Sequence, residues 1–326
     1  MDMSATAETL GTLQFDQGYS IIRKLEENIS GVVLGKSDVA RMCVVTLLAG
    51  EHLLLEDVPG VGKTLMGKAL ARSVDGEFRR IQFTPDLLPS DILGSCVFNT
   101  KTQEFIFNRG PIFSNFVLAD EINRAPPRTQ SALLEAMSDH QVSVDGTTHD
   151  LPQPFMVIAT QNPFEFEGTY VLPESQLDRF LMRISMGYPS REFEQELLLS
   201  HRNGEPVDTL SSVVNSATIS QVQNLARQVR VDQSIESYIL DVVRATRASS
   251  DLRVGVSTRG VLLWYRACQA LALASGRDYV TPDDVKHLAL PILGHRVMAK
   301  GIVQGGQRDS VEGIVRRIVE QVPIPG

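Results

Sequence analysis

The chain changes its pattern of hydrophobic and polar residues near Ser190. Before that position, short and continuous apolar runs alternate with longer stretches in which apolar residues recur every three or four positions. Short apolar runs are typical of strands buried on both faces of a sheet, and the longer stretches are typical of amphipathic helices. The alternation therefore predicts an α/β fold, a parallel sheet with helices on both sides. The predicted strands are residues 52–56, 78–83, 115–120, 155–160 and 181–186, and the predicted helices include residues 19–29, 39–49 and 65–73.

Two segments interrupt this alternation. Residues 95–107 contain two β-prone runs around the polar turn NTKTQE. Residues 141–149 alternate through Val142 and Val144 up to the turn dipeptide Asp145-Gly146. Both segments are predicted to be β-hairpins inserted into the α/β domain.

Beyond Ser190 the helical period continues without further strands. Ile235 opens an apolar stripe, spaced by three and four residues, that is wide enough to face a core. The sequence TPDD at 281–284 has the N-cap, the first-turn proline and the acidic residues of a helix start. We therefore expect three parts, which are a flexible tail over residues 1–17, an α/β domain over residues 18–189 and a smaller, all-helical domain over residues 190–326.

Composition narrows the class of protein. The 326 residues are 43% apolar and 21% charged, which is typical of a globular protein long enough for two domains. The 31 basic and 39 acidic residues give a net charge of -8, which argues against a protein that coats nucleic acid. Cys43, Cys96 and Cys268 are far apart and predict neither disulfides nor a thiolate metal site. With no secretory leader and no apolar run long enough to span a bilayer, we expect a cytoplasmic protein that reaches a membrane only through a partner.

The strongest local signal is EDVPGVGKT, which follows the first predicted strand and precedes a predicted helix. A phosphate-binding loop needs backbone N–H groups that turn inward, and Gly60 and Gly62 permit this. It also needs a lysine for the terminal phosphates and a hydroxyl for magnesium, which are Lys63 and Thr64. Asp57 departs from the usual pattern, which has glycine there, and aspartate tolerates unusual backbone angles. The alternative, an ordinary strand-to-helix turn, gives Lys63 and Thr64 no reason to be adjacent.

Two acids end the third predicted strand. Asp120 is placed beside the phosphate loop to hold magnesium through water, and Glu121 is placed to polarise an attacking water. Acids at a strand end are also common at the start of an ordinary loop. The phosphate loop favours the catalytic interpretation.

A further apolar strand ends in Thr160, Gln161 and Asn162. An amide at this position can hydrogen-bond both the water and the γ-phosphate, so Asn162 is a candidate sensor of an intact nucleotide. An asparagine before Pro163 is equally consistent with turn chemistry.

Two arginines have no evident local task. Arg179, in the sequence LDRF, can neutralise charge on a γ-phosphate, and if it lies far from its own loop it must serve a neighbouring subunit. The alternative is a surface ion pair between Asp178 and Arg179. Arg259, at the head of a helix in the second domain, is placed to reach across the interdomain cleft to the phosphates. Arg124 is a second candidate to face a neighbour.

With these motifs in this order, the sequence resembles the MoxR family of AAA+ ATPases, in the clade that includes magnesium chelatase subunits. The resemblance extends from about Leu34 to Pro291. Runs of this length are more specific than any single nucleotide-binding motif. The segments that carry the resemblance are RIQFTPDLLPSDILG at 80–94, VLADEINRAPPRTQSALLEAM at 117–137, QVSVDG at 141–146, VIATQNPFEFEGTYVLPESQLDRF at 157–180 and GRDYVTPDDV at 276–285.

The resemblance implies an AAA+ P-loop domain with a five-stranded parallel sheet and inserted hairpins, followed by an all-helical lid domain. It implies that ATP or ADP binds with Mg²⁺, and that Thr64 and Asp120 hold the metal. The residues implied in catalysis are Glu121 of the Walker B motif, Asn162 as sensor 1, Arg179 as arginine finger and Arg259 as sensor 2. The residues implied in nucleotide binding are Val32, Val33 and Gly35 near the adenine, and Asp57, Val58, Pro59, Gly60, Val61, Gly62, Lys63, Thr64 and Leu65 in the Walker A loop.

The resemblance further implies a Mg²⁺-dependent ATPase that forms a ring, a hexamer in such relatives. They act as chaperone-like factors for the assembly or activation of client proteins, and often have a partner with a von Willebrand factor A domain. A nucleic-acid motor stays open as an alternative, although residues 141–149 contain no lysine or arginine and the other hairpin has only Lys101 near its tip. A regulatory switch with little hydrolysis and a small-molecule kinase also stay open. Glu121, Asn162 and Arg179 argue against the switch.

Overall fold

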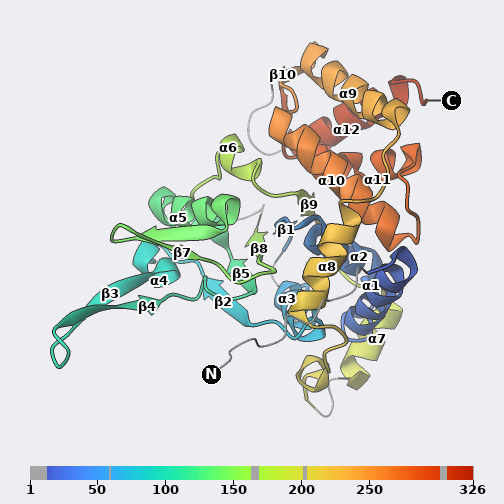
Figure 1. The fold of residues 1–326 in the computed structure, drawn as a ribbon. Helices are drawn as coiled ribbons and strands as arrows, with labels where there is room; N and C mark the ends of the chain where they lie inside the picture. The colour runs from blue at the N-terminus through green and yellow to red at the C-terminus, as the bar shows by residue number, and fades with distance from the viewer. Residues whose placement is uncertain (1–12, 59, 163–168, 201–203, 302–306, 326) are drawn as a thin grey trace, which may run out of the picture.

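The computed structural model describes residues 13–58, 60–162, 169–200, 204–301 and 307–325. Its centre is a five-stranded parallel sheet with the strand order β2-β5-β8-β1-β9 (Figure 1). All carboxyl ends of parallel strands meet on one side, here called the carboxyl end of the sheet, and all amino ends meet at the amino end. The predicted strands are confirmed as β1 (Leu53–Glu56), β2 (Phe78–Gln82), β5 (Phe116–Asp120), β8 (Met156–Gln161) and β9 (Met182–Ile184).

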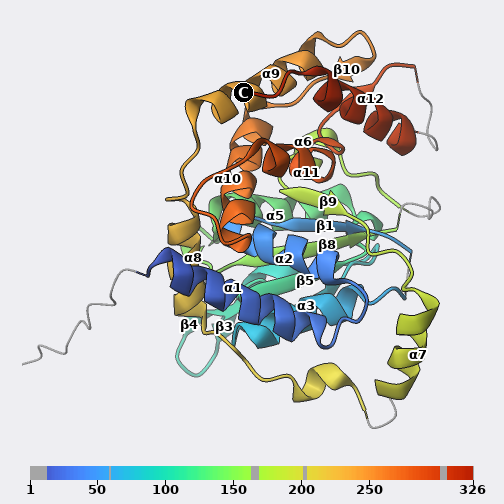
Figure 2. The ribbon, with the colours of Figure 1, turned by 90° about the vertical axis from the view of Figure 1, so that its right-hand side faces the viewer.

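Alternate residues of the strands face two separate hydrophobic cores. Leu53 and Leu55 pack into one core and Leu54 into the other, and all three are fully buried. Helices cover both faces, as predicted (Figure 2). The helices on the first face are α1 (Phe15–Ser30), α2 (Ser37–Ala49) and α3 (Lys63–Ser73), and the main helix on the second face is α5 (Pro127–Asp139).

Helix α5 runs back along the sheet after β5 and the short turn η1 (Ile122–Arg124). Its last turns therefore lie at the amino end of the sheet, beside the residue that precedes β1. His52 Nδ1 accepts a hydrogen bond from the Val157 N–H (3.0 Å), so its Nε2 carries the proton and donates to the Met137 carbonyl (2.9 Å). Burial lowers the pKa of His52 to about 3, so this link between strand and helix is made by a neutral ring.

Both predicted hairpins are present and antiparallel. They are β3 (Gly94–Asn99) with β4 (Glu104–Arg109), and β6 (Gln141–Val144) with β7 (Thr147–Asp150). The Asp145-Gly146 turn has positive φ at both residues (49° and 79°), as a tight two-residue hairpin requires. The β3–β4 hairpin projects away from the rest of the molecule (Figure 1). The short helix α4 (Pro89–Leu93) precedes it.

The chain after β9 is helical, as predicted, apart from one short pair of strands. Trp264 is fully buried in this region, whose core is continuous with the core on α2. The antiparallel pair β10 (Leu252–Val254) and β11 (Met298–Ala299) was not predicted, because strands this short show no recognisable period. The helical elements are α7 (Arg191–Ser200), η3 (Pro206–Thr209), α8 (Ser216–Ala226), α9 (Gln233–Ala248), α10 (Thr258–Ala274), α11 (Pro282–Leu293) and α12 (Gln307–Gln321).

The amino-terminal helix begins earlier than predicted. Residues 15–17, which the sequence analysis assigned to the tail, belong to α1. The cause is a local capping interaction, because the Gln17 side chain accepts a hydrogen bond from the Gln14 N–H (3.1 Å). Within the described part of the chain, no helix is long and apolar enough to cross a lipid bilayer.

Candidate functional site

The predicted phosphate loop joins β1 to α3 at the carboxyl end of the sheet. Gly60 and Gly62 have φ angles of 85° and 94°, which only glycine adopts at little cost. The loop delivers the chain to the N-terminus of α3, where free N–H groups and the helix dipole favour an anion. Lys63 is the first residue of α3, and its Nζ donates to the Asp57 carbonyl (2.8 Å). Burial lowers the pKa of Lys63, and the carboxylates of Asp120, Asp57 and Glu121 oppose that shift.

A cavity of about 580 Å³ opens beside this loop, a volume suitable for a nucleotide-sized ligand. The structure brings together there the two motifs that the sequence predicted to meet, the phosphate loop and the acid pair. Pro59 of the loop lies outside the described residues. The cavity is lined by Gly60, Gly62, Lys63, Thr64, Leu65, Lys68, Arg80, Gln82, Asp120, Glu121, Glu205 and Val207.

Asp57, the residue that replaces the usual glycine, anchors the loop to the segment that follows β9. Its carboxylate accepts hydrogen bonds from the Gly187 N–H (2.6 Å), the Ser185 hydroxyl (2.8 Å) and the Val58 N–H (2.8 Å). Burial raises the pKa of Asp57, but these hydrogen bonds outweigh it and lower the pKa below the ordinary value. Asp57 does not have a positive φ, so this position does not need the unusual backbone angle that an aspartate could have tolerated. Its role here is that of a hydrogen-bond acceptor.

Asp120 ends β5 and is held from two sides. Thr160 of β8 donates its hydroxyl to Asp120 Oδ1 (2.6 Å), and Arg80 of β2 donates to Oδ2 through Nη2 (2.5 Å) and Nε (3.1 Å). The neighbouring strands β2 and β8 therefore fix the orientation of the carboxylate. Arg80 supplies positive charge where the sequence predicts a magnesium ion.

Glu121 is held in a left-handed backbone conformation with φ 57°, which is uncommon for a residue with a side chain. Its N–H donates to the Thr160 hydroxyl (2.8 Å), so one threonine orients both acids. Its carboxylate accepts from Gln82 Nε2 (3.0 Å) and lies 3.1 Å from Arg124 Nε. Arg124, a candidate to face a neighbour, pairs with Glu121 within this chain.

The end of β8 lies next to the phosphate loop, because the Asp57 N–H donates to the Gln161 carbonyl (3.1 Å). Asn162 follows directly and is half-buried. Residues 163–168, with Pro163, lie outside the described residues. The topology thus brings Asn162 to the same end of the sheet as the loop and the acid pair.

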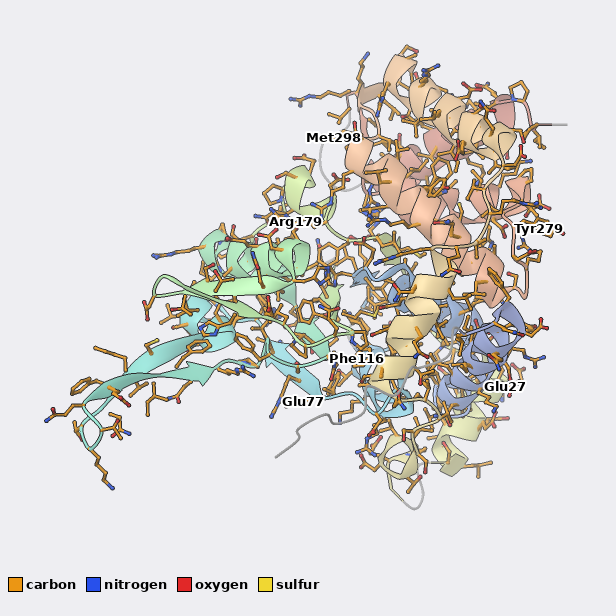
Figure 3. The ribbon with its side chains drawn as sticks, in the orientation of Figure 1. Glu27, Glu77, Phe116, Arg179, Tyr279 and Met298 are labelled. Atoms are coloured by element: carbon orange, nitrogen blue, oxygen red, sulfur yellow. The ribbon has the colours of Figure 1, made fainter. Side chains whose placement is uncertain are left out.

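The two candidate arginines lie at the other end of the sheet. Arg179 precedes β9, and the Leu181 N–H donates to the His52 carbonyl, which places this segment at the amino end (2.8 Å). Arg179 lies beside α5 (Figure 3). Its Nη1 donates to the Leu134 carbonyl (2.5 Å) and to the Ser138 hydroxyl (2.8 Å) of that helix. The phosphate loop follows β1 at the carboxyl end, so Arg179 does not serve its own loop.

Arg259 lies beside Arg179 and not beside the phosphate loop. Its Nη2 is 3.4 Å from the same Ser138 hydroxyl. The expectation that Arg259 reaches the phosphates of its own chain is therefore wrong. The reason is that α10 begins at the amino end of the sheet, where its N-cap residue Ser257 bonds to Asp178.

The predicted adenine-side residues lie beside an aromatic ring that the sequence analysis missed. Val32 and Val33 are buried, and Gly35 has φ 70°. The Phe193 ring of α7 packs on Gly35 so closely that a Cβ there would lie 2.5 Å from a ring carbon. Lys36 Nζ also donates to the Tyr188 carbonyl (2.9 Å), so the segment after β9 crosses this surface.

Known proteins are similar in sequence to this chain over nearly its whole length. The chain is 49% identical over 309 residues to YeaC of Bacillus subtilis, which covers 94% of this chain and 96% of that protein. It is 40% identical over 308 residues to Chaperone MoxR1 of Mycobacterium tuberculosis, which covers 91% of this chain and 80% of that protein. The chain belongs to the MoxR family of AAA ATPases. The expected family is confirmed.

Family descriptions and a solved structure agree with this assignment. Residues 52–182 match the ATPase family associated with various cellular activities (AAA), and residues 244–318 match the AAA lid domain. A crystal structure of a candidate ATPase from Cytophaga hutchinsonii superimposes with a TM-score of 0.86 at 38% identity and covers 96% of this chain and 97% of that chain. Magnesium-chelatase ChlI subunits of Arabidopsis thaliana and Chlorella vulgaris match 58% and 65% of the chain.

The residues present in this MoxR-family chain fit a magnesium ion bound with a nucleotide. In the described ranges, no group of three or more His, Cys, Asp or Glu residues forms a dedicated metal cage. Mg²⁺ in phosphate sites needs only one or two protein ligands, because phosphate oxygens and waters supply the rest. The Thr64 hydroxyl and the Asp120 carboxylate line the same cavity and are oxygen donors of the right kind.

Proposed function

We propose that this MoxR-family chain hydrolyses ATP to ADP and phosphate, with Mg²⁺, at the contact between neighbouring copies in a ring, a hexamer by analogy with the family. The observation that carries the proposal is the separation of the two halves of the site. The cavity with Lys63 and Glu121 opens at the carboxyl end of the sheet, and Arg179 and Arg259 lie at the amino end. A single chain therefore cannot bring its own arginines to its own phosphates.

Each proposed site residue at the carboxyl end of the sheet has a role in hydrolysis. The N–H groups of the loop and the Lys63 ammonium bind the β- and γ-phosphates, and Lys63 leaves the Asp57 carbonyl to do so. Glu121 polarises the attacking water, and Asn162 hydrogen-bonds the γ-phosphate. Thr64 and Asp120 would hold Mg²⁺, which would neutralise charge on the phosphate oxygens.

Arg179 and Arg259 complete the site of the next copy. Their guanidinium groups neutralise charge that builds up on the γ-phosphate during transfer, and such an arginine accelerates phosphoryl transfer by roughly a thousandfold or more. Their contacts to Ser138 and Leu134 use neutral acceptors and are readily exchanged for phosphate oxygens.

The proposed biological role is that of a chaperone-like factor that assembles or activates client proteins, including a partner with a von Willebrand factor A domain. The name of the relative from Mycobacterium tuberculosis, Chaperone MoxR1, supports a chaperone role. The projecting β3–β4 hairpin exposes Phe98 (48%) and Phe105 (73%), whose rings pack together at 5.2 Å, as a surface for contact with protein. We do not propose direct binding of nucleic acid, because Lys101 is the only basic residue near the tip of this hairpin. The proposed location is the cytoplasm.

The test combines two inactive variants. Glu121→Gln is expected to bind ATP without hydrolysing it, and Arg179→Ala is expected to be inactive alone. A mixture regains activity, because an Arg179→Ala copy has an intact Glu121 and receives Arg179 from a Glu121→Gln copy. The turnover per wild-type chain also rises with protein concentration. Mixed assemblies that form but stay inactive, with a turnover independent of concentration, would refute hydrolysis between copies.

A further inference from the structure

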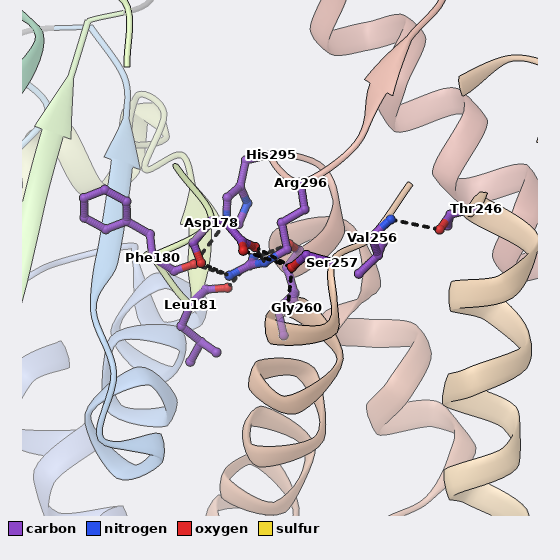
Figure 4. Close-up of polar contacts among 10 residues, drawn as sticks. Asp178, Phe180, Leu181, Thr246, Val256, Ser257, Gly260, His295 and Arg296 are labelled. Atoms are coloured by element: carbon purple, nitrogen blue, oxygen red, sulfur yellow. Dashed lines mark hydrogen bonds and ion pairs between the residues drawn. The ribbon is translucent and has the colours of Figure 1, made fainter. Parts of the chain in front are cut away.

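A buried ionic cluster joins the segment before β9 to the carboxyl-terminal helices. Its centre is the guanidinium of Arg296, whose side chain is fully buried (0% exposed) next to Asp178 (20% exposed). Arg296 Nε donates to Asp178 Oδ1 at 3.0 Å (Figure 4). The same guanidinium donates to the carbonyls of Asp178, Phe180, Leu181 and Ile292.

Asp178 also fixes the start of α10. The Ser257 hydroxyl is 2.9 Å from Asp178 Oδ2 and 3.1 Å from Oδ1, and it accepts the Gly260 N–H (2.9 Å) as the N-cap of the helix (Figure 4). Arg259 lies in the first turn of that helix. The Asp178 carboxylate therefore holds Ser257, which lies two residues before the candidate arginine Arg259.

The other candidate arginine is the next residue in the chain. Arg179 follows Asp178 directly, and its guanidinium meets the guanidinium of Arg259 at the Ser138 hydroxyl of α5 (2.8 and 3.4 Å). One carboxylate thus connects the backbone of Arg179, the cap of the Arg259 helix and the buried Arg296. No residue of this cluster lines the cavity at the phosphate loop.

We propose that Asp178 is a positioning residue that locks Arg179 and Arg259 of one copy into a single unit, so that both arginines are presented together to the nucleotide of the neighbouring copy. The inference rests on the proposed hydrolysis between copies. Its physical basis is that a buried guanidinium without its carboxylate is strongly unfavourable, so Arg296 and Asp178 stay together and hold the two elements in register. Burial lowers the pKa of Arg296 to about 10 and Asp178 opposes this shift, which agrees with an obligatory pair.

The main test is Asp178→Asn, which keeps the size of the side chain and removes its charge. We expect kcat to fall about tenfold, because misplacing a group by about 1 Å can cost up to a hundredfold. The Kd for ATP is expected to stay within about twofold of wild type, because the phosphate loop lies at the other end of the sheet. Mixing Asp178→Asn with Glu121→Gln restores turnover, because the intact arginines of the second variant then serve the intact loop of the first.

A second pair of variants leaves the buried ion pair in place. Ser257→Ala removes the link between Asp178 and α10, and Ser257→Thr keeps a hydroxyl at the helix cap. We expect kcat to fall several-fold in Ser257→Ala and to recover in Ser257→Thr. This pair decides the question if Asp178→Asn does not fold. The matched control is Asp251→Asn, which removes another carboxylate of the carboxyl-terminal region. Asp251 pairs at the surface with Arg317 (3.3 Å), and we expect this variant to leave kcat unchanged.

The outcomes separate this inference from the proposed function. If Arg179→Ala keeps the full kcat, the proposed function is wrong and Asp178 has no arginine to position. If Arg179→Ala is inactive while folded Asp178→Asn and Ser257→Ala both keep the wild-type kcat, only the positioning role is wrong. It is equally wrong if the loss in Asp178→Asn is not recovered by Glu121→Gln in mixed assemblies that native mass spectrometry detects.

Discussion

The carboxylate at position 57 offers a sharp test of how the phosphate loop is held. The usual loop has glycine there, so a purely sequence-based argument predicts that Asp57→Gly is harmless or beneficial. The structure predicts the opposite, because Asp57 ties the loop to Ser185 and Gly187 after β9. We expect both Asp57→Gly and Asp57→Asn to destabilise the protein and to weaken ATP binding.

The magnitude follows from the hydrogen bonds of the carboxylate. In Asp57→Asn, one oxygen still accepts from Val58, but an amide nitrogen replaces the oxygen that accepts from the Gly187 N–H at 2.6 Å. A hydrogen bond to a charged group contributes about 1.5–3 kcal/mol, and an unsatisfied buried donor costs about 1–3 kcal/mol. Because the two effects overlap, we expect the free energy of unfolding to fall by about 2–4 kcal/mol in Asp57→Asn. This is a large part of the stability of a typical protein.

The effect also depends on pH, with a definite sign. The pKa of Asp57 is lowered in the folded protein from its ordinary value of 3.8. Its contribution to stability is therefore complete above that ordinary value and is lost as the pH falls through the lowered folded pKa. Urea unfolding at a series of pH values measures it, and the difference between wild type and Asp57→Asn shrinks at the acidic end.

A matched control is Asp208→Asn, which removes an exposed carboxylate paired with Arg72 (3.0 Å). Exposed pairs of this kind contribute roughly 0–1 kcal/mol, so this variant stays close to wild type. If Asp57→Asn and Asp57→Gly unfold like wild type and bind ATP with unchanged affinity, the anchoring argument fails. If only the ATP affinity falls, Asp57 acts on the ligand and not on the loop.

Three further substitutions test other parts of the site. Lys63→Ala is expected to abolish ATP binding in calorimetry, because Lys63 supplies the positive charge in the first turn of α3, where the phosphates are expected to bind. An unchanged Kd would refute the assignment of the phosphate loop. Thr160→Val is expected to lower kcat by roughly tenfold with little change in KM, because its hydroxyl orients both acids of the catalytic pair; equal losses in binding and turnover would contradict this. Phe193→Ala is expected to weaken ATP binding about five- to tenfold, since stacking on a base contributes about 1–3 kcal/mol, and to leave the affinity for inorganic tripolyphosphate unchanged. Leu198→Ala, on the same helix and 76% exposed, is its control.

The strands and the phosphate loop could be predicted because their signals are local. Leu53, Leu54 and Leu55 are consecutive and all buried, and a run this short that ends in a glycine-rich turn is typical of a strand covered on both faces. The adjacency of Lys63 and Thr64 after two glycines has one ready explanation, phosphate binding. Parallel pairing then brings Asp120 and Asn162 to the same end of the sheet without any knowledge of side-chain contacts.

Arg259 could not be placed in the same way, because its position depends on how α10 docks. The docking is decided by the buried Arg296, which is 118 residues from Asp178 in the sequence, and no periodicity reports that contact. Phe193 escaped notice for a similar reason, because a phenylalanine in an amphipathic helix reads as an ordinary core residue. Thr160 lies within an apolar strand, and the role of its hydroxyl becomes evident only from its contacts with Asp120 and Glu121.

The separation of the two halves of the proposed site also restricts how copies of this chain assemble. A two-fold contact through one end of the sheet pairs loops with loops or arginines with arginines, so the site stays incomplete. A head-to-tail contact brings the carboxyl end of one sheet to the amino end of the next, and its repetition closes a ring when the rotation between copies divides a full turn. This geometry can be tested with Lys68→Cys at the cavity and Ser138→Cys beside the arginines, in a chain whose half-buried Cys96 is replaced by serine. The head-to-tail arrangement predicts that a short crosslinker joins the two variants only when they are mixed with ATP, whereas a two-fold contact through one end of the sheet joins copies of one variant alone.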